Sequence, residues 1–82
     1  MEAVVLVKAS DSLELTLKFN TSQEHWFDMK PYLDKGDFKR LKNLSLFNQA
    51  YVAFDTVCWP GNLDIAPATL YDKSRELVSA TK

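Results

Sequence analysis

The chain has 82 residues, a length that suits one domain and leaves no room for a second hydrophobic core. Ten basic and eleven acidic residues give a net charge of -1, without the positive excess that general nucleic-acid binding requires. No apolar run approaches the length needed to cross a bilayer, and the single cysteine cannot form an intrachain disulfide. We therefore expect one cytoplasmic domain over residues 1–82, with no membrane segment and with nucleic acid disfavoured as a partner.

The N-terminal third of the chain predicts three strands. Residues 3–9 form an apolar, mostly β-branched run, as expected of a strand that is covered on both faces. Residues 13–20 alternate strictly between apolar and polar side chains, which places one face in the core and the other in water. After a polar turn, Trp26 and Phe27 mark a third strand that ends near Asp28. These runs predict an antiparallel meander.

The middle of the chain predicts a short helix with a basic side. Pro31 suits the start of a helical turn and Gly36 its end, and a helix is expected near residues 37–43. Helical spacing brings together four basic residues that form a candidate partner surface: Lys35, Lys39, Arg40 and Lys42. Asp34 and Asp37 partly compensate this charge, so a solvated helix face is the alternative interpretation.

A second hairpin is expected further along the chain. Residues 49–54 have the composition of a strand, and Asp55 with Thr56 is expected to turn the chain back into a strand at residues 57–59. Pro60 and Gly61 then occupy the central positions of a type II turn, which ends this hairpin.

The remaining residues predict a second helix. Pro67 suits its first position, and Leu70, Ser74 and Leu77 continue a helical register toward the C-terminus. The Asp64 carboxylate is expected to accept backbone N–H groups in the turn or at the helix start. The elements together predict a single α+β domain. Its small antiparallel sheet consists of the N-terminal three-stranded meander plus the second hairpin, and two short helical segments accompany it.

Catalytic and metal sites find little support in the sequence. Cys58, His25 and Asp28 are the residue types of a cysteine nucleophile system. However, Cys58 lies in an apolar strand and is expected to be a small buried hydrophobe, and His25 a strand residue with a partly solvated ring. A second histidine for a common zinc site is missing, and the two isolated glycines form no phosphate loop. We expect no catalytic residue, metal or cofactor.

Two stretches carry a resemblance to a known family, namely "FDMKPYLDKGDFKRLKNLSLF" and "VCWPGNLDIAPATLY". Together they resemble the bacterial family catalogued as domain of unknown function 2442 over nearly the whole chain. The residues that carry the resemblance are Asp28, Trp59, Gly61, Asp64, Pro67, Leu70 and Tyr71. We expect these residues to be structural, with Trp59 and Tyr71 packing in the core; a pocket or partner surface is the alternative for both aromatics.

The resemblance implies a small α+β domain and no established activity. Members are sometimes fused to a helix-turn-helix domain or encoded beside a small protein in a suspected toxin–antitoxin pair. We therefore predict a non-enzymatic protein-interaction module, with membership of a toxin–antitoxin-like pair as one form of that function. A partner would add a strand to an exposed edge or cover a patch near the central helix, and a homo-oligomer is also compatible with the sequence. The alternatives are a nucleic-acid-binding accessory domain and a small enzyme that uses Cys58.

Overall fold

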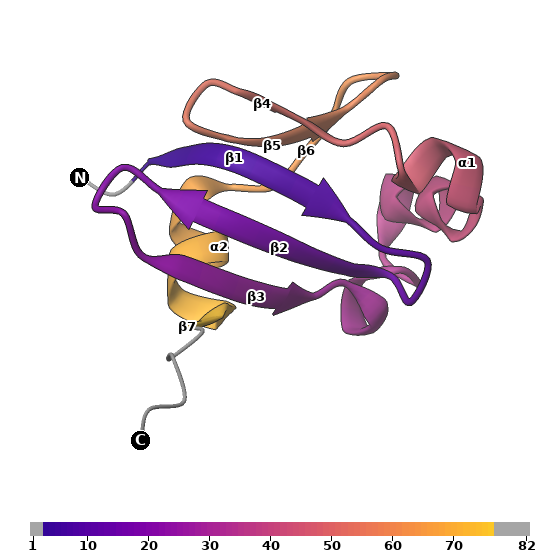
Figure 1. Cartoon of the computed structure of the whole chain (residues 1–82). Coiled ribbons are helices and arrows are strands. Elements are labelled where there is room, and N and C mark those ends of the chain that lie inside the picture. The colour runs from indigo at the N-terminus through magenta and orange to yellow at the C-terminus, as the bar shows by residue number, and fades with distance from the viewer. Residues whose placement is uncertain (1–2, 77–82) are drawn as a thin grey trace.

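The computed structural model of the chain describes residues 3–76 and consists of two antiparallel sheets with short helices (Figure 1). The larger sheet has the strand order β1-β2-β3-β7, with bounds Val4–Ala9, Glu14–Phe19, Glu24–Asp28 and Arg75–Glu76. The smaller sheet has the order β4-β5-β6, with bounds Tyr51–Ala53, Thr56–Trp59 and Leu63–Asp64. The predicted α+β class, the meander β1-β2-β3 and the hairpin β4-β5 are confirmed.

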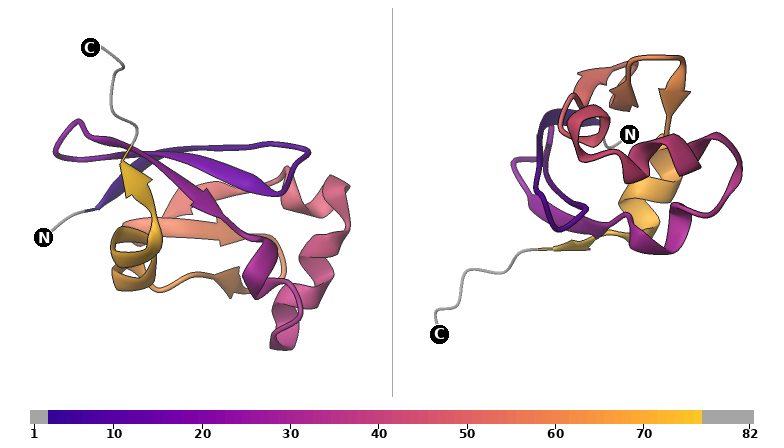
Figure 2. Two further views of the ribbon diagram at one scale, coloured as in Figure 1. Left: turned by 90° about the horizontal axis from the view of Figure 1, so that it is seen from below. Right: turned by 90° about the vertical axis from the view of Figure 1, so that its right-hand side faces the viewer.

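The helices lie at one end of the sheets and on one of their faces (Figures 1 and 2). Two 3-10 helices, η1 and η2, span Lys30–Tyr32 and Gly36–Lys42. Two α-helices, α1 and α2, span Leu44–Phe47 and Pro67–Lys73. In Figure 2 the larger sheet forms one layer, and the smaller sheet with α2 forms the other.

The core lies between these two layers. On β2 the predicted alternation is confirmed, because Leu15, Leu17 and Phe19 are buried while Thr16 on the opposite face is exposed. Trp59 on β5 is fully buried on the other side of this core. The two-residue period of a strand therefore specifies which side chains meet the smaller sheet.

The expectation that β1 is covered on both faces is wrong. Val5 and Leu6 have exposed fractions of 46% and 61%. β1 is an edge strand, and its pairing with β2 is irregular between Val4 and Leu6, which indicates a β-bulge. The run of β-branched residues therefore identified the strand correctly but not its surroundings, since no element of residues 3–76 covers the outer face of the larger sheet.

The turn of the second hairpin lies one residue earlier than predicted. Phe54 and Asp55 form it, with φ angles of +54° and +65°. Two successive left-handed residues are typical of a type I′ turn, which matches the twist of paired strands. Thr56 belongs to β5 instead, because it pairs with Ala53 of β4, and its buried hydroxyl donates a hydrogen bond to the Ile65 carbonyl oxygen.

The C-terminal region differs from the expected long helix. After the turn at Gly61 the chain first adds β6 to the smaller sheet. Helix α2 ends at Lys73, and Ser74 is extended with a ψ of 160°. The chain then pairs with β3 as β7, so the helical register at Ser74 is wrong, and Leu77 lies outside the described residues. Two-residue strands such as β6 and β7 leave no periodic signal in a sequence.

The predicted helix near residues 37–43 exists, but as the 3-10 helix η2, and α1 follows it directly. Gly36 has a φ of +51° and begins η2 instead of closing the turn at Pro31. With three residues per turn, Lys39 and Lys42 align, whereas Lys35 stands before the helix as its extended N-cap. The α-helical alignment of these three lysines is therefore wrong.

Candidate functional site

The four basic residues of the predicted partner surface are exposed, and three of them interact locally. Lys42 forms an ion pair with Asp34, with Nζ and Oδ1 2.6 Å apart. The Arg40 Nη2 donates a hydrogen bond of 3.1 Å to the Gly61 carbonyl oxygen. The Lys35 ammonium lies 5.4 Å from the centre of the Tyr32 ring. These local partners weaken the case for one continuous basic docking face.

Gly61 is a position where an added methyl group should destabilise the domain. Its φ of +93° is unfavourable for other residues, and a Cβ atom would lie 2.9 Å from the Arg40 Nη1. We expect Gly61→Ala to lower the free energy of unfolding by about 1–2 kcal/mol and to displace Arg40. Chemical denaturation measures this loss.

Gly36 provides the matched control for that change. It has a φ of +51°, but nothing lies within 4 Å of the position that an added methyl group would occupy. Gly36→Ala therefore tests backbone strain alone, and Gly61→Ala adds the loss of the Arg40 hydrogen bond. Equal stability of the Gly61→Ala variant and the parent chain would contradict the strain argument.

The three residue types of a cysteine nucleophile system lie apart. His25 is buried, against the expectation of a partly solvated ring, and packs on Phe19 and Tyr71 with ring centres 4.7 and 5.8 Å away. Its Nδ1 lies 2.7 Å from the Ser74 Oγ, and its Nε2 is buried without a hydrogen-bond partner among residues 3–76. The arrangement holds α2 and β7 against β3.

Asp28 serves the turn that follows β3. Its carboxylate accepts hydrogen bonds from the backbone N–H and the ammonium group of Lys30, each at 3.0 Å. Burial acts to raise the pKa of Asp28, but these bonds outweigh it and lower the pKa below its ordinary value. Within the described part of the chain, no hydrogen bond or ion pair joins any two of Asp28, His25 and Cys58.

Cys58 is buried, with an exposed fraction of 5%. Burial, and then the charge of Asp64, raise the pKa of its thiol above the ordinary value. A reactive cysteine needs the opposite conditions, namely access and a lowered pKa. The geometry therefore gives Cys58 the character of an inert, buried residue.

We expect iodoacetamide to modify Cys58 far more slowly in the folded chain than in the chain unfolded by urea. The raised pKa keeps the thiol protonated, and burial blocks the reagent. Mass spectrometry of timed samples measures the rate of modification. Equal rates for folded and unfolded protein would contradict burial.

The raised pKa of Cys58 also makes the stability of the domain depend on pH. Because the folded-state pKa lies above the unfolded value of 9.0, Cys58 contributes stability below that pH, and this contribution is lost as the pH rises through the folded pKa.

Most residues of the Trp59-to-Tyr71 motif have visible structural contacts. The Trp59 Nε1 donates a hydrogen bond of 2.9 Å to the Phe47 carbonyl oxygen, and Leu70 is fully buried. Tyr71 packs edge-on against Phe19 with ring centres 5.4 Å apart, and Pro67 begins α2. These contacts connect β5, α1, α2 and the larger sheet.

Asp64 is the exception within this motif. The expectation that it accepts backbone N–H groups at the helix start is wrong, because α2 begins after Ala66 and has no side-chain cap. Asp64 lies in β6 and is exposed. In the part of the chain that the structure describes, its carboxylate has neither a hydrogen-bond partner nor an ion-pair partner. It has no visible role in holding the fold together.

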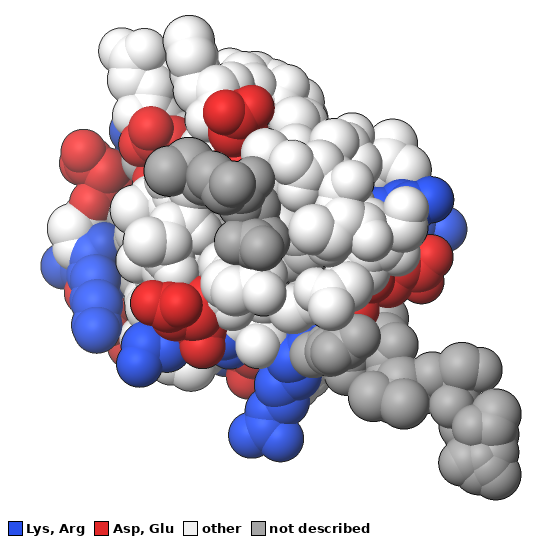
Figure 3. All heavy atoms as spheres, turned by 90° about the vertical axis from the view of Figure 1, so that its left-hand side faces the viewer, with Lys and Arg blue, Asp and Glu red and all other residues white. Residues whose placement is uncertain are grey.

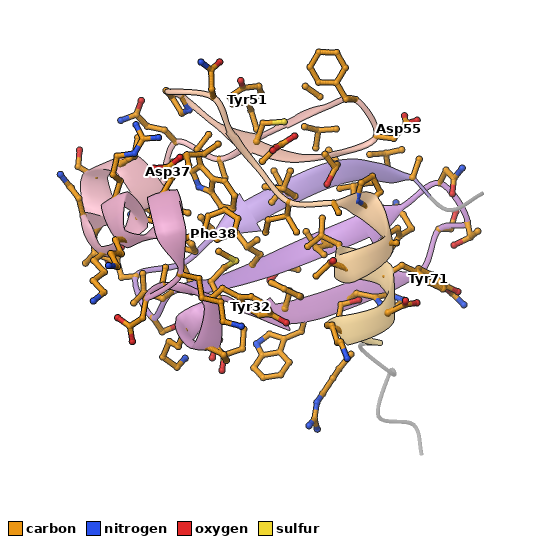
Figure 4. All side chains as sticks on the ribbon, turned by 180° about the vertical axis from the view of Figure 1, so that it is seen from behind. Tyr32, Asp37, Phe38, Tyr51, Asp55 and Tyr71 are labelled. Atoms are coloured by element: carbon orange, nitrogen blue, oxygen red, sulfur yellow. The ribbon has the colours of Figure 1, made fainter. Side chains whose placement is uncertain are left out.

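A shallow groove runs along β6, and Asp64 lines each of its three hollows. We call it the β6 groove. Lys35 and Phe38 line two hollows of about 380 and 350 Å³ on the side of the 3-10 helices, and Tyr32 lines the second of these. Tyr51 and Phe54 line a third hollow of about 200 Å³ on the side of the β4-β5 hairpin. Figure 4 views this face, with Tyr51 on the hairpin side and Phe38 and Tyr32 on the helix side.

The backbone of Asp64 also faces this groove. Strand β6 is an edge of the smaller sheet. The Ile65 N–H donates to the Val57 carbonyl oxygen at 3.2 Å, so Ile65 directs its backbone groups toward β5. Because these directions alternate along an antiparallel strand, the neighbouring Asp64 directs its N–H and carbonyl away from β5. Among residues 3–76, the backbone groups of Asp64 therefore have no strand partner on this side of β6, and its carboxylate lies beside them without a partner.

A comparison with protein families gives one match. The model of the family described as "Protein of unknown function (DUF2442)" matches residues 4–76. The chain belongs to the DUF2442 family. The predicted resemblance is thus confirmed, and neither a curated protein nor a solved structure matches the chain. Across the described residues of this DUF2442 protein, no helix could span a membrane and no three metal-ligating side chains are grouped.

The residues that line the groove of this DUF2442 protein were only partly visible in its sequence. Asp64 was selected with the family motif, but for a capping role that it does not have. Tyr51 and Phe54 were assigned to a strand and not to a site. Phe54 gives no signal in the sequence alone, because the sequence predicts the turn at Asp55 and Thr56 and places Phe54 in the preceding strand.

Proposed function

We propose that this protein is a non-enzymatic protein-interaction module that binds its partner through the β4-β5 hairpin. The observation that carries the proposal is Phe54. Its side chain is 90% exposed, and its φ of +54° is a left-handed conformation. That conformation costs a bulky residue about 1–2 kcal/mol, and Phe54 contributes almost no packing in return. An aromatic side chain held in water at such a position is suited to contact with another molecule.

A second exposed aromatic residue lies near this turn. Tyr51 is exposed and lines the third hollow of the β6 groove together with Phe54, and we call these two residues the hairpin patch. A hydrogen bond of 3.1 Å from the Val4 N–H to the Asp55 carbonyl oxygen joins the start of β1 to the turn. Figure 3 shows this side of the molecule, where uncharged surface covers much of the upper part, Asp and Glu side chains interrupt it, and Lys and Arg lie toward the margins. Contiguous exposed apolar surface marks interaction sites in many proteins.

The alternatives have less support. Cys58 is buried with a raised pKa, which does not favour a small enzyme that uses it. A net charge of -1 and the local pairing of Arg40 and Lys42 do not favour nucleic acid. We place the protein in the bacterial cytoplasm as part of the proposal, since a single buried cysteine suits a reducing compartment.

The test replaces Phe54 by asparagine, which tolerates the left-handed conformation. We expect Phe54→Asn to raise the free energy of unfolding by about 1 kcal/mol while partner retention falls. Denaturation curves measure the first effect. Quantitative mass spectrometry of proteins retained from an extract of the native source by the immobilised full chain measures the second.

Leu44→Asn is the matched control, because Leu44 is 40% exposed on α1 and does not belong to the hairpin patch. A protein that binds the parent chain and the Leu44→Asn variant, but not the Phe54→Asn variant, supports the proposal. An identical set of retained proteins for all three chains would refute it.

A further inference from the structure

The third hollow of the β6 groove has the composition of a site for a positively charged side chain. Its lining residues are Tyr51, Phe54, Cys58, Trp59, Asn62, Leu63 and Asp64. Asp64 is the one charged residue among them. The hollow of about 200 Å³ lies beside Phe54, so a partner that covers the hairpin patch also reaches this hollow.

The carboxylate of Asp64 is available to a ligand. It is exposed, and none of the ion pairs of residues 3–76 includes it. Asp64 lies directly opposite Cys58 in the pairing of β5 and β6, and Cys58 lies directly opposite Tyr51 in the pairing of β4 and β5. These three side chains therefore form one row across the outer face of the smaller sheet. The negative charge of Asp64 also contributes to the raised pKa of Cys58, which agrees with this placement.

The aromatic residues add a second kind of attraction. Tyr51 is 47% exposed and Phe54 is 90% exposed, so the faces of both rings are accessible to a cation. A guanidinium group is planar, stacks on aromatic rings and donates two parallel hydrogen bonds to a carboxylate. The ammonium group of lysine is more strongly hydrated, so it stacks less well on aromatic rings, and it does not form the paired hydrogen bonds to a carboxylate. The hollow therefore favours arginine over lysine.

The strand edge at Asp64 indicates how such a side chain would arrive. The Asp64 backbone groups point away from β5, and the two larger hollows lie along this edge. An extended segment that pairs with Asp64 would place the side chain opposite Asp64 on the same face of the sheet. That side chain would extend the row formed by Tyr51, Cys58 and Asp64.

We propose that the hollow between Tyr51, Phe54 and Asp64 binds an arginine side chain of an extended segment of the partner protein. This inference rests on the proposed function, because it names the partner chemistry that the hairpin patch would recognise. The Asp64 carboxylate accepts hydrogen bonds from the guanidinium group, and the two aromatic rings stack on the plane of this group.

The test uses a short peptide as the probe. The ¹⁵N-labelled full chain is titrated with acetyl-valyl-arginyl-valine amide while its amide chemical shifts are followed by NMR. The control peptide contains citrulline in place of arginine, which keeps the shape but removes the charge. We expect saturable shifts at Tyr51, Cys58 and Asp64 with the arginine peptide, and weaker binding at higher salt concentration.

Two variants locate the interaction. Asp64→Asn is expected to weaken binding of the arginine peptide about tenfold, because it removes a charge-assisted pair. Asp37→Asn is the matched control, since Asp37 is exposed and lines the hollow of about 380 Å³ but not the third hollow. We expect its affinity for the peptide to equal that of the parent chain.

Equal binding of the citrulline peptide, equal affinity of the Asp64→Asn variant, or shifts confined to other residues would each overturn the inference. Self-association through this face, detected by sedimentation as an Asp64-independent dimer, would also overturn it. If Phe54→Asn abolishes partner retention while the arginine peptide does not bind, the proposed function stands and only this inference fails. If the arginine peptide binds as expected but Phe54→Asn changes no retained protein, the hollow stands and the proposed function fails.

Discussion

Replacing Trp59 by alanine is expected to lower the free energy of unfolding by about 3–5 kcal/mol. The Trp59 side chain is fully buried, and its ring stacks on Phe47 with centres 6.0 Å apart. The change also removes the hydrogen bond from the Trp59 Nε1 to the Phe47 carbonyl oxygen. Domains of this size have total stabilities of roughly 5–15 kcal/mol, so the loss is a large share. Urea denaturation followed by circular dichroism measures it.

Trp59→Phe separates the two contributions at this position. Phenylalanine keeps much of the ring contact with Phe47 but removes one of the two hydrogen bonds to the Phe47 carbonyl oxygen, which still accepts from the Ala50 N–H at 3.3 Å. We expect a smaller loss of about 1–3 kcal/mol for this variant. An unchanged denaturation midpoint for Trp59→Ala would contradict the assignment of Trp59 as a core residue that joins β5 to α1.

The second large effect is expected at His25. His25→Ala removes a ring that packs between Phe19 and Tyr71 and breaks the hydrogen bond to Ser74. We expect this variant to lower the free energy of unfolding by about 2–5 kcal/mol, as other large-to-small changes in cores do. Thermal denaturation measures the loss.

His25→Phe is the control that keeps the ring and removes both polar nitrogen atoms. The Nε2 of His25 has no hydrogen-bond partner among the described residues, and the Ser74 Oγ also interacts with the Tyr71 carbonyl oxygen at 3.4 Å. We therefore expect His25→Phe to be close to the parent chain in stability. A loss as large as that of His25→Ala would instead assign the stabilising role to the Ser74 hydrogen bond.

Local sequence patterns predicted the elements in which buried and solvated side chains alternate regularly along the chain. The alternation of β2 reports one buried and one solvated face, and both are observed. The apolar run of β1 carries no such alternation, so it could not show that Val5 and Leu6 are exposed at a bulged edge. Strands β6 and β7 contain two residues each, and their pairing depends on partners distant in sequence. Such elements follow from tertiary packing and not from propensity.

The candidate site was less predictable than the fold. Asp64 precedes a proline-initiated helix, and that position suggested a cap; the two residues between Asp64 and Pro67 instead carry the chain from β6 to α2. The exposure of Tyr51 and Phe54 depends on how the hairpin lies beside β1, which no local pattern specifies. Phe54 breaks the usual chemistry of a type I′ turn, and such local conflicts are expected at functional sites.

The bond between His25 and Ser74 joins residues that are 49 positions apart, whereas the strands of the meander are neighbours in sequence. Closing a long loop costs more chain entropy than forming a hairpin, so the meander can form well before β7 reaches β3. We therefore expect the strand that completes the larger sheet to join after the meander and to separate before it. Amide hydrogen exchange at β7 should accordingly proceed by local opening, while β2 exchanges only when the whole domain unfolds.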